Sequence, residues 1–133
     1  MTSAADYTGS GGFDEFLGVE VVELTGDRCV MRIEVSPQLL QPWGILHGGV
    51  HCSLIESVAS VGAAVWYGDR GTVVGVNNST NFLRAVRAGV VTYVGTPIQQ
   101  GRTQQLWVVE GRTEDGKLVA QGQVRLSNLP KPD

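Results

Sequence analysis

The longest hydrophobic run in the sequence covers residues 50–67 and follows the turn-forming segment His47-Gly48-Gly49. Apart from Gly62, the run contains neither glycine nor proline, and Glu56 is its one carboxylate. A helix that is apolar on nearly every face is typical of a protein interior. About 20 residues at 1.5 Å each give a helix roughly 30 Å long, close to the diameter of a small domain. The pattern therefore predicts one buried helix around which the rest of the chain folds.

Shorter segments with strand-like patterns lie on both sides of this helix. Two precede it and are joined by a Thr25-Gly26-Asp27 turn, and four follow it, separated by glycine-containing turns. The predicted strands cover residues 19–24, 28–35, 72–83, 90–97, 103–113 and 118–127. Short hairpin connections imply antiparallel pairing. We therefore expect an α+β fold in which a six-stranded antiparallel sheet wraps a long central helix, with a partner subunit covering its open side.

The 133 residues are predicted to form a single domain over residues 13–128, with a short helical segment over residues 13–19 at its start. Residues 1–12 are polar and rich in Gly, Ser and Thr, which favours a flexible arm and does not resemble a signal peptide. Residues 129–133 contain two prolines and are expected to form a flexible tail.

Composition excludes several classes of function. A net charge of −3 gives no basic footprint for nucleic acid, and the charged and polar residues within the hydrophobic run argue against a membrane span. Cys29 and Cys52 lie in apolar patterns without metal-ligand spacing, as expected of free thiols in a reducing cytoplasm. No nucleotide-binding or serine-hydrolase motif is present, so we expect no metal and no cofactor.

The His47-Gly48-Gly49 segment is the first candidate for chemistry. The first N–H groups of a helix have no intrahelical acceptor and lie at the positive end of the helix dipole. Glycines there allow close approach to the backbone, which suits a carbonyl oxygen that gains negative charge during acyl transfer. Alternatively, the glycines only shape a tight turn into the helix.

Glu56 is the second candidate, because a carboxylate on a buried helix needs a partner or a function. It follows Gly48 by eight residues, or roughly 12 Å along a helix axis. One carbonyl cannot reach both groups of the same helix, so a shared site requires two helices packed antiparallel across a two-fold axis. Ser60, one turn further on, shares a face with Glu56 and can hold the carboxylate or a water. The alternative is a structural glutamate satisfied by backbone groups or by an arginine.

Other candidates have weaker signals. Gln41 can reach back toward a bound carbonyl, whereas His47 and His51 are interpreted first as residues that stabilise the turn or line the site. Trp43 and Phe82 are candidates for an apolar acyl pocket, with core packing as the alternative. Three arginines near loops can meet phosphates or can simply be solvated; these are Arg84, Arg87 and Arg102.

Residues 41–49, QPWGILHGG, followed by Glu56-Ser57 and Ser60, resemble the hotdog-fold acyl-CoA thioesterases. The similar branch is the PaaI-like group, which includes the hydroxybenzoyl-CoA and dihydroxynaphthoyl-CoA thioesterases. The resemblance extends from about residue 13 to residue 127 and includes Asn81 and Gly101-Arg102. It implies that the backbone N–H of Gly48 polarises the thioester carbonyl.

The resemblance also assigns roles to side chains. Gln41 assists the carbonyl or orients the attacking group, and His47 lies near the sulfur or supports the turn. Glu56 is the catalytic carboxylate, either as nucleophile or as general base on water. The expected substrate-binding positions are Ser60, Gly49, Trp43, Asn81, Phe82 and Arg102. The expected assembly is a homodimer with shared active sites, paired further into a tetramer.

One position departs from the family pattern, because some relatives carry histidine where this chain has Phe82. The change favours a more apolar or aromatic acyl group. The sequence therefore predicts a cytoplasmic acyl-CoA thioesterase for aromatic or medium-chain substrates. Two alternatives are a non-catalytic acyl-CoA-binding module and a hotdog dehydratase or hydratase, which would need an Asp–His pair that the predicted helix lacks.

Overall fold

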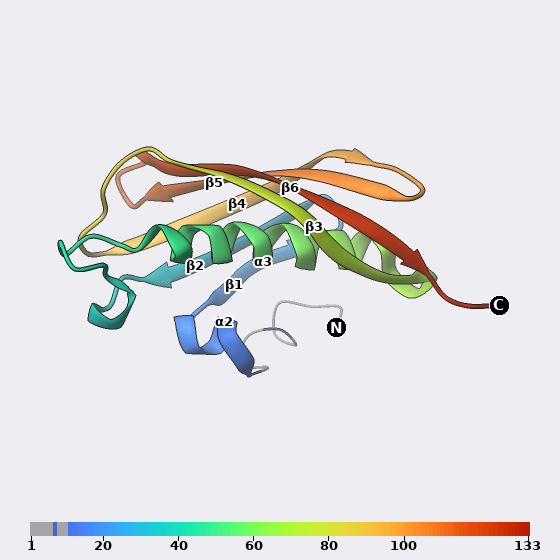
Figure 1. Cartoon of the computed structure of the whole chain (residues 1–133), viewed down its shortest axis with the longest axis horizontal. Helices are drawn as coiled ribbons and strands as arrows, with labels where there is room; N and C mark the ends of the chain where they lie inside the picture. Colours follow the sequence, from blue (N-terminus) through green and yellow to red (C-terminus); the bar gives the residue numbers. More distant parts are fainter. Residues whose placement is uncertain (1–6, 8–10) are drawn as a thin grey trace.

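The computed structural model describes Tyr7 and residues 11–133, so most of the predicted N-terminal arm lies outside the described residues. Helix α3 (Gly48–Tyr67) is the long central element, and Figure 1 shows the strands curving around it. Within residues 11–133, three short helical segments accompany it: α2 (Gly12–Leu17), η1 (Pro37–Leu39) and η2 (Gly68–Arg70). The helix predicted from the hydrophobic run is confirmed, and it begins directly at Gly48.

A single six-stranded sheet has the order β1-β2-β4-β5-β6-β3, and all neighbouring pairs are antiparallel. The strands are β1 (Glu20–Thr25), β2 (Arg28–Glu34), β3 (Gly71–Phe82), β4 (Val90–Gln100), β5 (Gln104–Thr113) and β6 (Leu118–Pro130). The predicted fold class and the order of the elements along the chain are therefore confirmed. The expected hairpin between the third and fourth strands is wrong, because β3 pairs with β6 at the edge of the sheet and β4 pairs with β2. Strand β4 runs past Pro97, because a register shift between Pro97 and Gln99 accommodates the proline.

The core lies between α3 and the inner face of the sheet. Leu54, Ile55, Val58 and Ala59 of α3 are fully buried, and Gly62 lets the sheet approach closely. A Cβ at position 62 would come within 2.6 Å of the Trp107 ring, so the helix can pack here only with glycine. The segment Gly48–Arg70 is long and apolar enough to cross a membrane. Its burial against the sheet accounts for this apolar composition.

Strand β6 ends later than the sequence predicts. Leu129 and Pro130, expected in a flexible tail, pair with Thr72 and Gly71 of β3. The preceding Asn128 is buried and donates to the carbonyl oxygens of Gly101 and Arg102, while its Oδ1 accepts from Gln105. These long-range hydrogen bonds hold the strand in place despite its proline.

We expect Asn128→Ala to lower the free energy of unfolding by about 1–3 kcal/mol, because buried hydrogen-bonding groups of Gln105 and Gly101 lose their partner. Chemical denaturation measures the change. Gln123→Ala, an exposed position of the same strand, serves as the matched control and should stay within about 0.5 kcal/mol of wild type. Equal stability of both variants would contradict the anchoring role of Asn128.

Candidate active site

The turn before α3 presents the backbone of Gly48. His47 is the N-cap residue of α3, and its Nδ1 accepts a hydrogen bond of 2.8 Å from the N–H of Gly49. Backbone bonds from His47 N–H to Leu39 O and from Leu46 N–H to Val86 O fix the incoming chain. Among the described residues, the Gly48 N–H has no hydrogen-bond acceptor. A free donor therefore lies at the positive end of a 20-residue helix.

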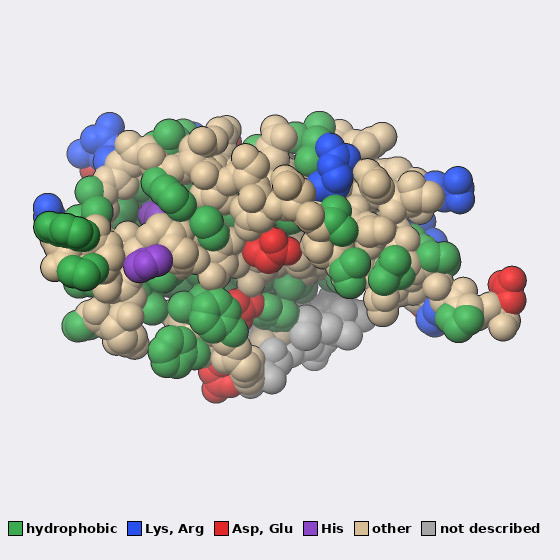
Figure 2. Space-filling model, in the orientation of Figure 1, with side chains coloured by type: hydrophobic (Ala, Val, Ile, Leu, Met, Phe, Trp, Pro, Cys, Tyr) green, Lys and Arg blue, Asp and Glu red, His purple; other side chains and the backbone are tan. Residues whose placement is uncertain are grey.

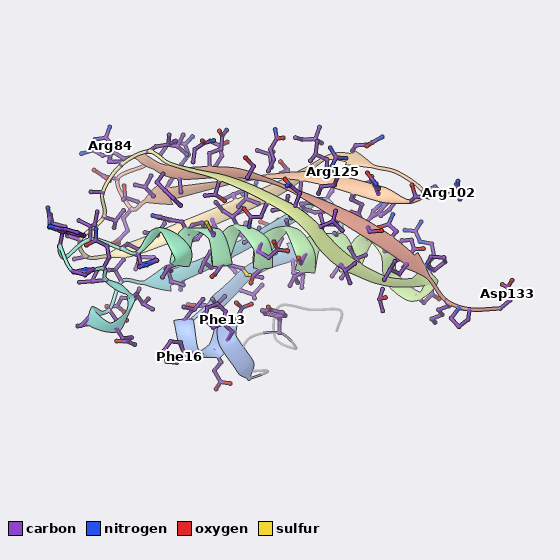
Figure 3. All side chains as sticks on the ribbon, viewed as in Figure 1. Phe13, Phe16, Arg84, Arg102, Arg125 and Asp133 are labelled. Carbon is purple, nitrogen blue, oxygen red and sulfur yellow. The ribbon has the colours of Figure 1, made fainter. Side chains whose placement is uncertain are left out.

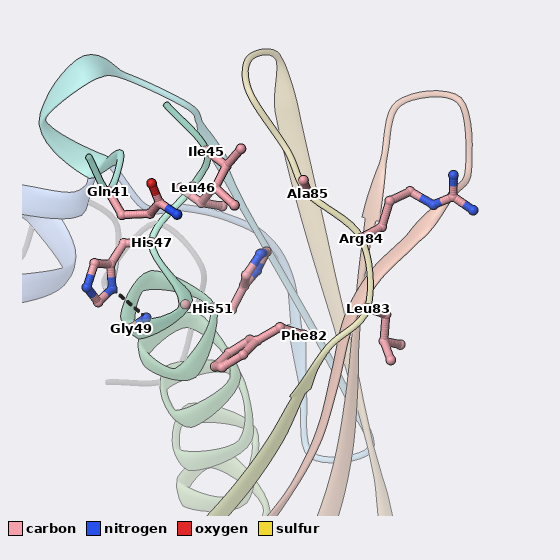
Figure 4. A pocket seen from close by; sticks show the side chains of 11 residues that line it. Gln41, Ile45, Leu46, His47, Gly49, His51, Phe82, Leu83, Arg84 and Ala85 are labelled. Atoms are coloured by element: carbon pink, nitrogen blue, oxygen red, sulfur yellow. Dashed lines mark hydrogen bonds between the residues drawn. The ribbon is translucent and has the colours of Figure 1, made fainter. Parts of the chain in front are cut away.

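A pocket of about 570 Å³ opens beside this helix end. Its walls come from the loop before α3, from the first turn of α3 and from the segment that leaves β3 (Figure 4). The lining residues are Gln41, Ile45, Leu46, His47, Gly48, Gly49, His51, Phe82, Leu83, Arg84 and Ala85. Gln41, Gly48, Gly49, His47 and Phe82, all predicted site residues, thus meet in one pocket.

The aromatic ring of Phe82 forms the wall closest to the helix end. A Cβ at position 48 would lie 2.8 Å from Phe82 Cζ, so the ring covers Gly48 at van der Waals distance. Phe82 also stacks on His51, with ring centroids 6.2 Å apart and an interplanar angle of 30°. The Phe82 side chain stays 59% exposed. It is available to a ligand and does not belong to the core.

His51 is the buried polar group of the pocket wall. Its Nδ1 forms a 2.8 Å hydrogen bond with the hydroxyl of Tyr93, which is fully buried. Burial lowers the pKa of His51 from 6.5 to about 4 and raises the pKa of Tyr93. The ring is therefore neutral near pH 7 and contributes an uncharged wall.

Glu56 lies outside this pocket, as the reach argument predicts. Its Oε2 accepts from the Ser60 hydroxyl at 3.1 Å, and its Oε1 accepts from the Asn78 side-chain amide at 3.4 Å. A Cβ at Gly75 would lie only 2.2 Å from Oε2, so β3 passes directly against the carboxylate. Ser60 thus holds the carboxylate as expected, and the carboxylate is half-buried between α3 and β3.

Four expected substrate-binding residues do not line the pocket: Ser60, which binds Glu56 instead, and Trp43, Asn81 and Arg102. Trp43 is 80% exposed in the turn, where its backbone N–H donates to the side-chain oxygen of Gln41. Asn81 lies on the outer face of β3, because Thr80 and Phe82 on either side of it face α3. Arg102 lies in the β4–β5 turn, at the opposite end of the molecule from Arg84 (Figure 3).

Asn78 and Thr80 were not predicted from the sequence, although the alternation of side chains along a strand indicates them. Residues of a strand that are two apart share a face, so choosing Phe82 for the pocket also places Thr80 and Asn78 on the inner face. The resemblance to known motifs drew attention to Asn81, which has the opposite orientation.

The fold and the pocket together define a class of protein: a hotdog fold with a pocket suited to an acyl carbonyl at the N-terminal end of its central helix. A family model described as the thioesterase superfamily matches residues 44–120. The chain therefore belongs to the thioesterase superfamily, and the predicted family, fold and class of thioester hydrolase are confirmed.

Individual relatives agree with this assignment. Rv1847 of Mycobacterium tuberculosis, a candidate esterase, is 46% identical over 88% of this chain and 86% of that protein. AziG from S. sahachiroi, a protein of known structure, has 50% sequence identity to this chain. The two structures superpose with a TM-score of 0.89, and the match covers 91% of this chain and 98% of that one. A 1,4-dihydroxy-2-naphthoyl-CoA hydrolase of Listeria monocytogenes is 35% identical over 81% of this chain and 88% of that protein.

The buried neutral His51 predicts a pH-dependent stability. Its folded pKa lies below its ordinary value, so the unfolded chain binds more protons between pH 6.5 and about pH 4. The free energy of unfolding should therefore decrease by up to about 3 kcal/mol as the pH falls through this window. Chemical denaturation of wild type and His51→Gln over this pH range measures how steeply the free energy of unfolding of each protein depends on pH. Other groups titrate in both proteins, so the difference between the two slopes reports on His51. Identical slopes would refute the assignment.

Proposed function

We propose that this thioester hydrolase cleaves acyl-CoA into free acid and CoA, and that its acyl group is aromatic or of medium chain length. The observation that carries the proposal is the Gly48 N–H, which has no acceptor among the described residues and lies in a pocket whose wall includes Phe82. The name of the Listeria relative, a naphthoyl-CoA hydrolase, supports CoA as the thiol and an aromatic acyl group.

The shape and chemistry of the pocket support an apolar acyl group. Its volume of about 570 Å³ falls within the range typical of small-ligand sites. Ile45 and Leu46 contribute aliphatic surface, and Phe82 offers an exposed ring face on which an aryl group can stack. His51 is neutral and adds no charge to this wall, and the charged side chain of Arg84 points away from the pocket (Figure 4).

The thioester carbonyl would lie against the Gly48 N–H, where the helix dipole stabilises the developing oxyanion. Gln41 lines the same pocket and can assist the carbonyl. His47 Nδ1 already accepts from the Gly49 N–H, so a proton on this ring lies on Nε2. That Nε2–H is the group with which His47 can approach the sulfur or the carbonyl.

Glu56 would complete the site from a partner subunit. Within one chain it lies two helical turns from Gly48 and outside the pocket, so one subunit supplies Gly48, Gln41 and His47 and the other supplies Glu56. The carboxylate attacks the carbonyl carbon or takes a proton from an attacking water. If the carboxylate attacks, the C–S bond breaks as a mixed anhydride with Glu56 forms, and water then hydrolyses the anhydride to the free acid and restores the carboxylate. If the carboxylate acts as a base, water adds directly to the carbonyl carbon before the C–S bond breaks. In both cases CoA leaves as its thiol.

The two edges of the sheet suggest where the subunits meet. Edge strand β1 is short and carries Glu20 and Glu23, each in an ion pair with an arginine of β2. Edge strand β3 has 12 residues and no charged side chain. An uncharged long edge is prone to pair with another strand. We infer that two β3 strands pair in the dimer.

Strand β3 is also the strand against which Glu56 packs, so this interface brings each carboxylate next to the partner. Figure 2 shows an acidic side chain exposed near the middle of this face, surrounded mainly by hydrophobic and uncharged groups. We extend the proposal to a dimer of dimers in the cytoplasm. The family resemblance supports the tetramer, and the free thiols of Cys29 and Cys52 suit a reducing compartment.

Glu56→Ala should lower turnover by about a thousand-fold or more while the protein stays folded, because the attacking group or its base is lost. Release of free CoA thiol from a panel of aromatic and aliphatic acyl-CoAs measures it, with the exposed Glu34→Ala as control. Near-normal turnover of Glu56→Ala would refute the mechanism. Stoichiometric binding without turnover by wild type would favour the acyl-CoA-binding module.

Gly48→Pro tests the backbone donor and the shared site together. Position 48 is the first residue of α3, where proline is tolerated, and His47 has the extended conformation that proline requires before it. Loss of the N–H should reduce turnover by about 10²–10³-fold relative to Gly48→Ala. The alanine variant keeps the donor and places the same Cβ beside Phe82, so it controls for that contact.

A mixture of refolded Glu56→Ala and Gly48→Pro chains should regain about a quarter of wild-type activity, because half of the dimers are mixed and each mixed dimer has one intact site of two. Turnover is measured before and after mixing. No recovery from two folded, exchanging variants would contradict the shared site.

A further inference from the structure

A second cluster of polar side chains lies away from the pocket, between α3 and the middle of β3. It joins Glu56 and Ser60 of the helix to Asn78 and Thr80 of the strand, and all four side chains are half-buried. Elsewhere the inner face of the sheet packs large apolar residues such as Met31, Trp107 and Leu126 against α3. Polar groups on this face therefore require a structural or functional explanation.

The orientation of the Asn78 amide is determined at both ends. Its Nδ2 donates to the backbone carbonyl of Cys52 at 3.0 Å, and that oxygen can only accept. Its Oδ1 accepts from the Thr80 hydroxyl at 2.7 Å. The second hydrogen of Nδ2 is thereby directed at Glu56 Oε1, 3.4 Å away. Thr80 fixes the amide, and the amide fixes one oxygen of the carboxylate.

The other oxygen is held from two sides. Ser60 donates to Oε2, and Gly75 leaves room for it, because a Cβ at that position would overlap Oε2. The glycine precedes a register shift between Gly75 and Asn77 that sets which following residues face the helix. Strand β3 thus provides a niche fitted to the carboxylate.

We propose that Asn78, oriented by Thr80, is a positioning residue for the catalytic carboxylate of Glu56. The inference rests on the proposed function, in which Glu56 reacts with a thioester bound to the partner subunit. A carboxylate that must reach across an interface reacts faster when its rotamer is fixed before the substrate arrives. Asn78 acts on the direction of the carboxylate and does not touch the substrate.

Steady-state hydrolysis of the best acyl-CoA by Asn78→Ala and Thr80→Val tests this role. We expect kcat to fall about ten-fold or more in both variants, with KM within about two-fold of wild type. Thr80→Ser, which keeps the hydroxyl, should restore kcat, and Asn77→Ala on the outer face should match wild type. Gly75→Ala should also lower kcat, because its Cβ displaces the flexible carboxylate before it disturbs the backbone.

The side-chain carboxyl ¹³C resonance of Glu56, assigned by its loss in Glu56→Gln, gives a readout independent of turnover. It should shift and broaden in Asn78→Ala and Thr80→Val but not in Asn77→Ala. Thermal unfolding controls for stability, and if Asn78→Ala fails to fold, the Thr80→Val and Thr80→Ser pair decides. Wild-type kcat in folded Thr80→Val overturns this inference alone, whereas a wild type without turnover on any ester overturns the proposed function and the inference together.

Discussion

The rise of a straight helix separates Gly48 from Glu56 by roughly 12 Å, and this separation determines how a site can be built. The helix is the core of the domain, so it cannot bend to bring the two groups together without losing the packing of Leu54, Ile55 and Val58. One rigid element therefore presents a carbonyl site at its end and a carboxylate on its side. Only a second copy of the helix can bring these groups together.

Strand β3 connects these two features to the edge of the molecule. Its last residue, Phe82, covers Gly48, while Gly75 and Asn78 contact the Glu56 carboxylate. Within the part of the chain that the structure describes, one edge of the same strand is unpaired, and the strand carries no charged side chain to protect that edge. Packing against the core and shaping of the pocket thus depend on one 12-residue segment, and the proposed pairing between subunits would depend on it too.

Much of the fold could be predicted from the sequence because its signals are local. The hydrophobic run, the glycine-containing turns and the alternation in residues 118–127 specify their elements without knowledge of the rest. The end of β6 could not be predicted this way, since Asn128 is held by Gly101, Arg102 and Gln105, which are distant in sequence. A proline-rich tail has no local signal for such bonds.

The site was predictable to a similar degree and for the same reason. The His47-Gly48-Gly49 turn and the spacing to Glu56 are local, and the structure gathers the former with Gln41 and Phe82. The faces of β3 depend on a register shift between Gly75 and Asn77 and on what α3 presents opposite them. The family resemblance indicates Asn81, which lies on the outer face, and gives no signal for Asn78, whose side chain contacts Glu56.

The half-burial of Glu56 links assembly to reactivity. In one chain the carboxylate keeps access to water on the side that Ser60, Asn78 and β3 leave open. Pairing of β3 strands would cover that side with the partner's pocket and exclude water except where the reaction needs it. Electrostatic interactions strengthen as water leaves a site, so in the proposed dimer the interactions of both the Gly48 donor and the carboxylate with the substrate would become stronger. A carboxylate that would destabilise a closed core is thus placed near the edge of the domain, where the proposed partner would complete its surroundings.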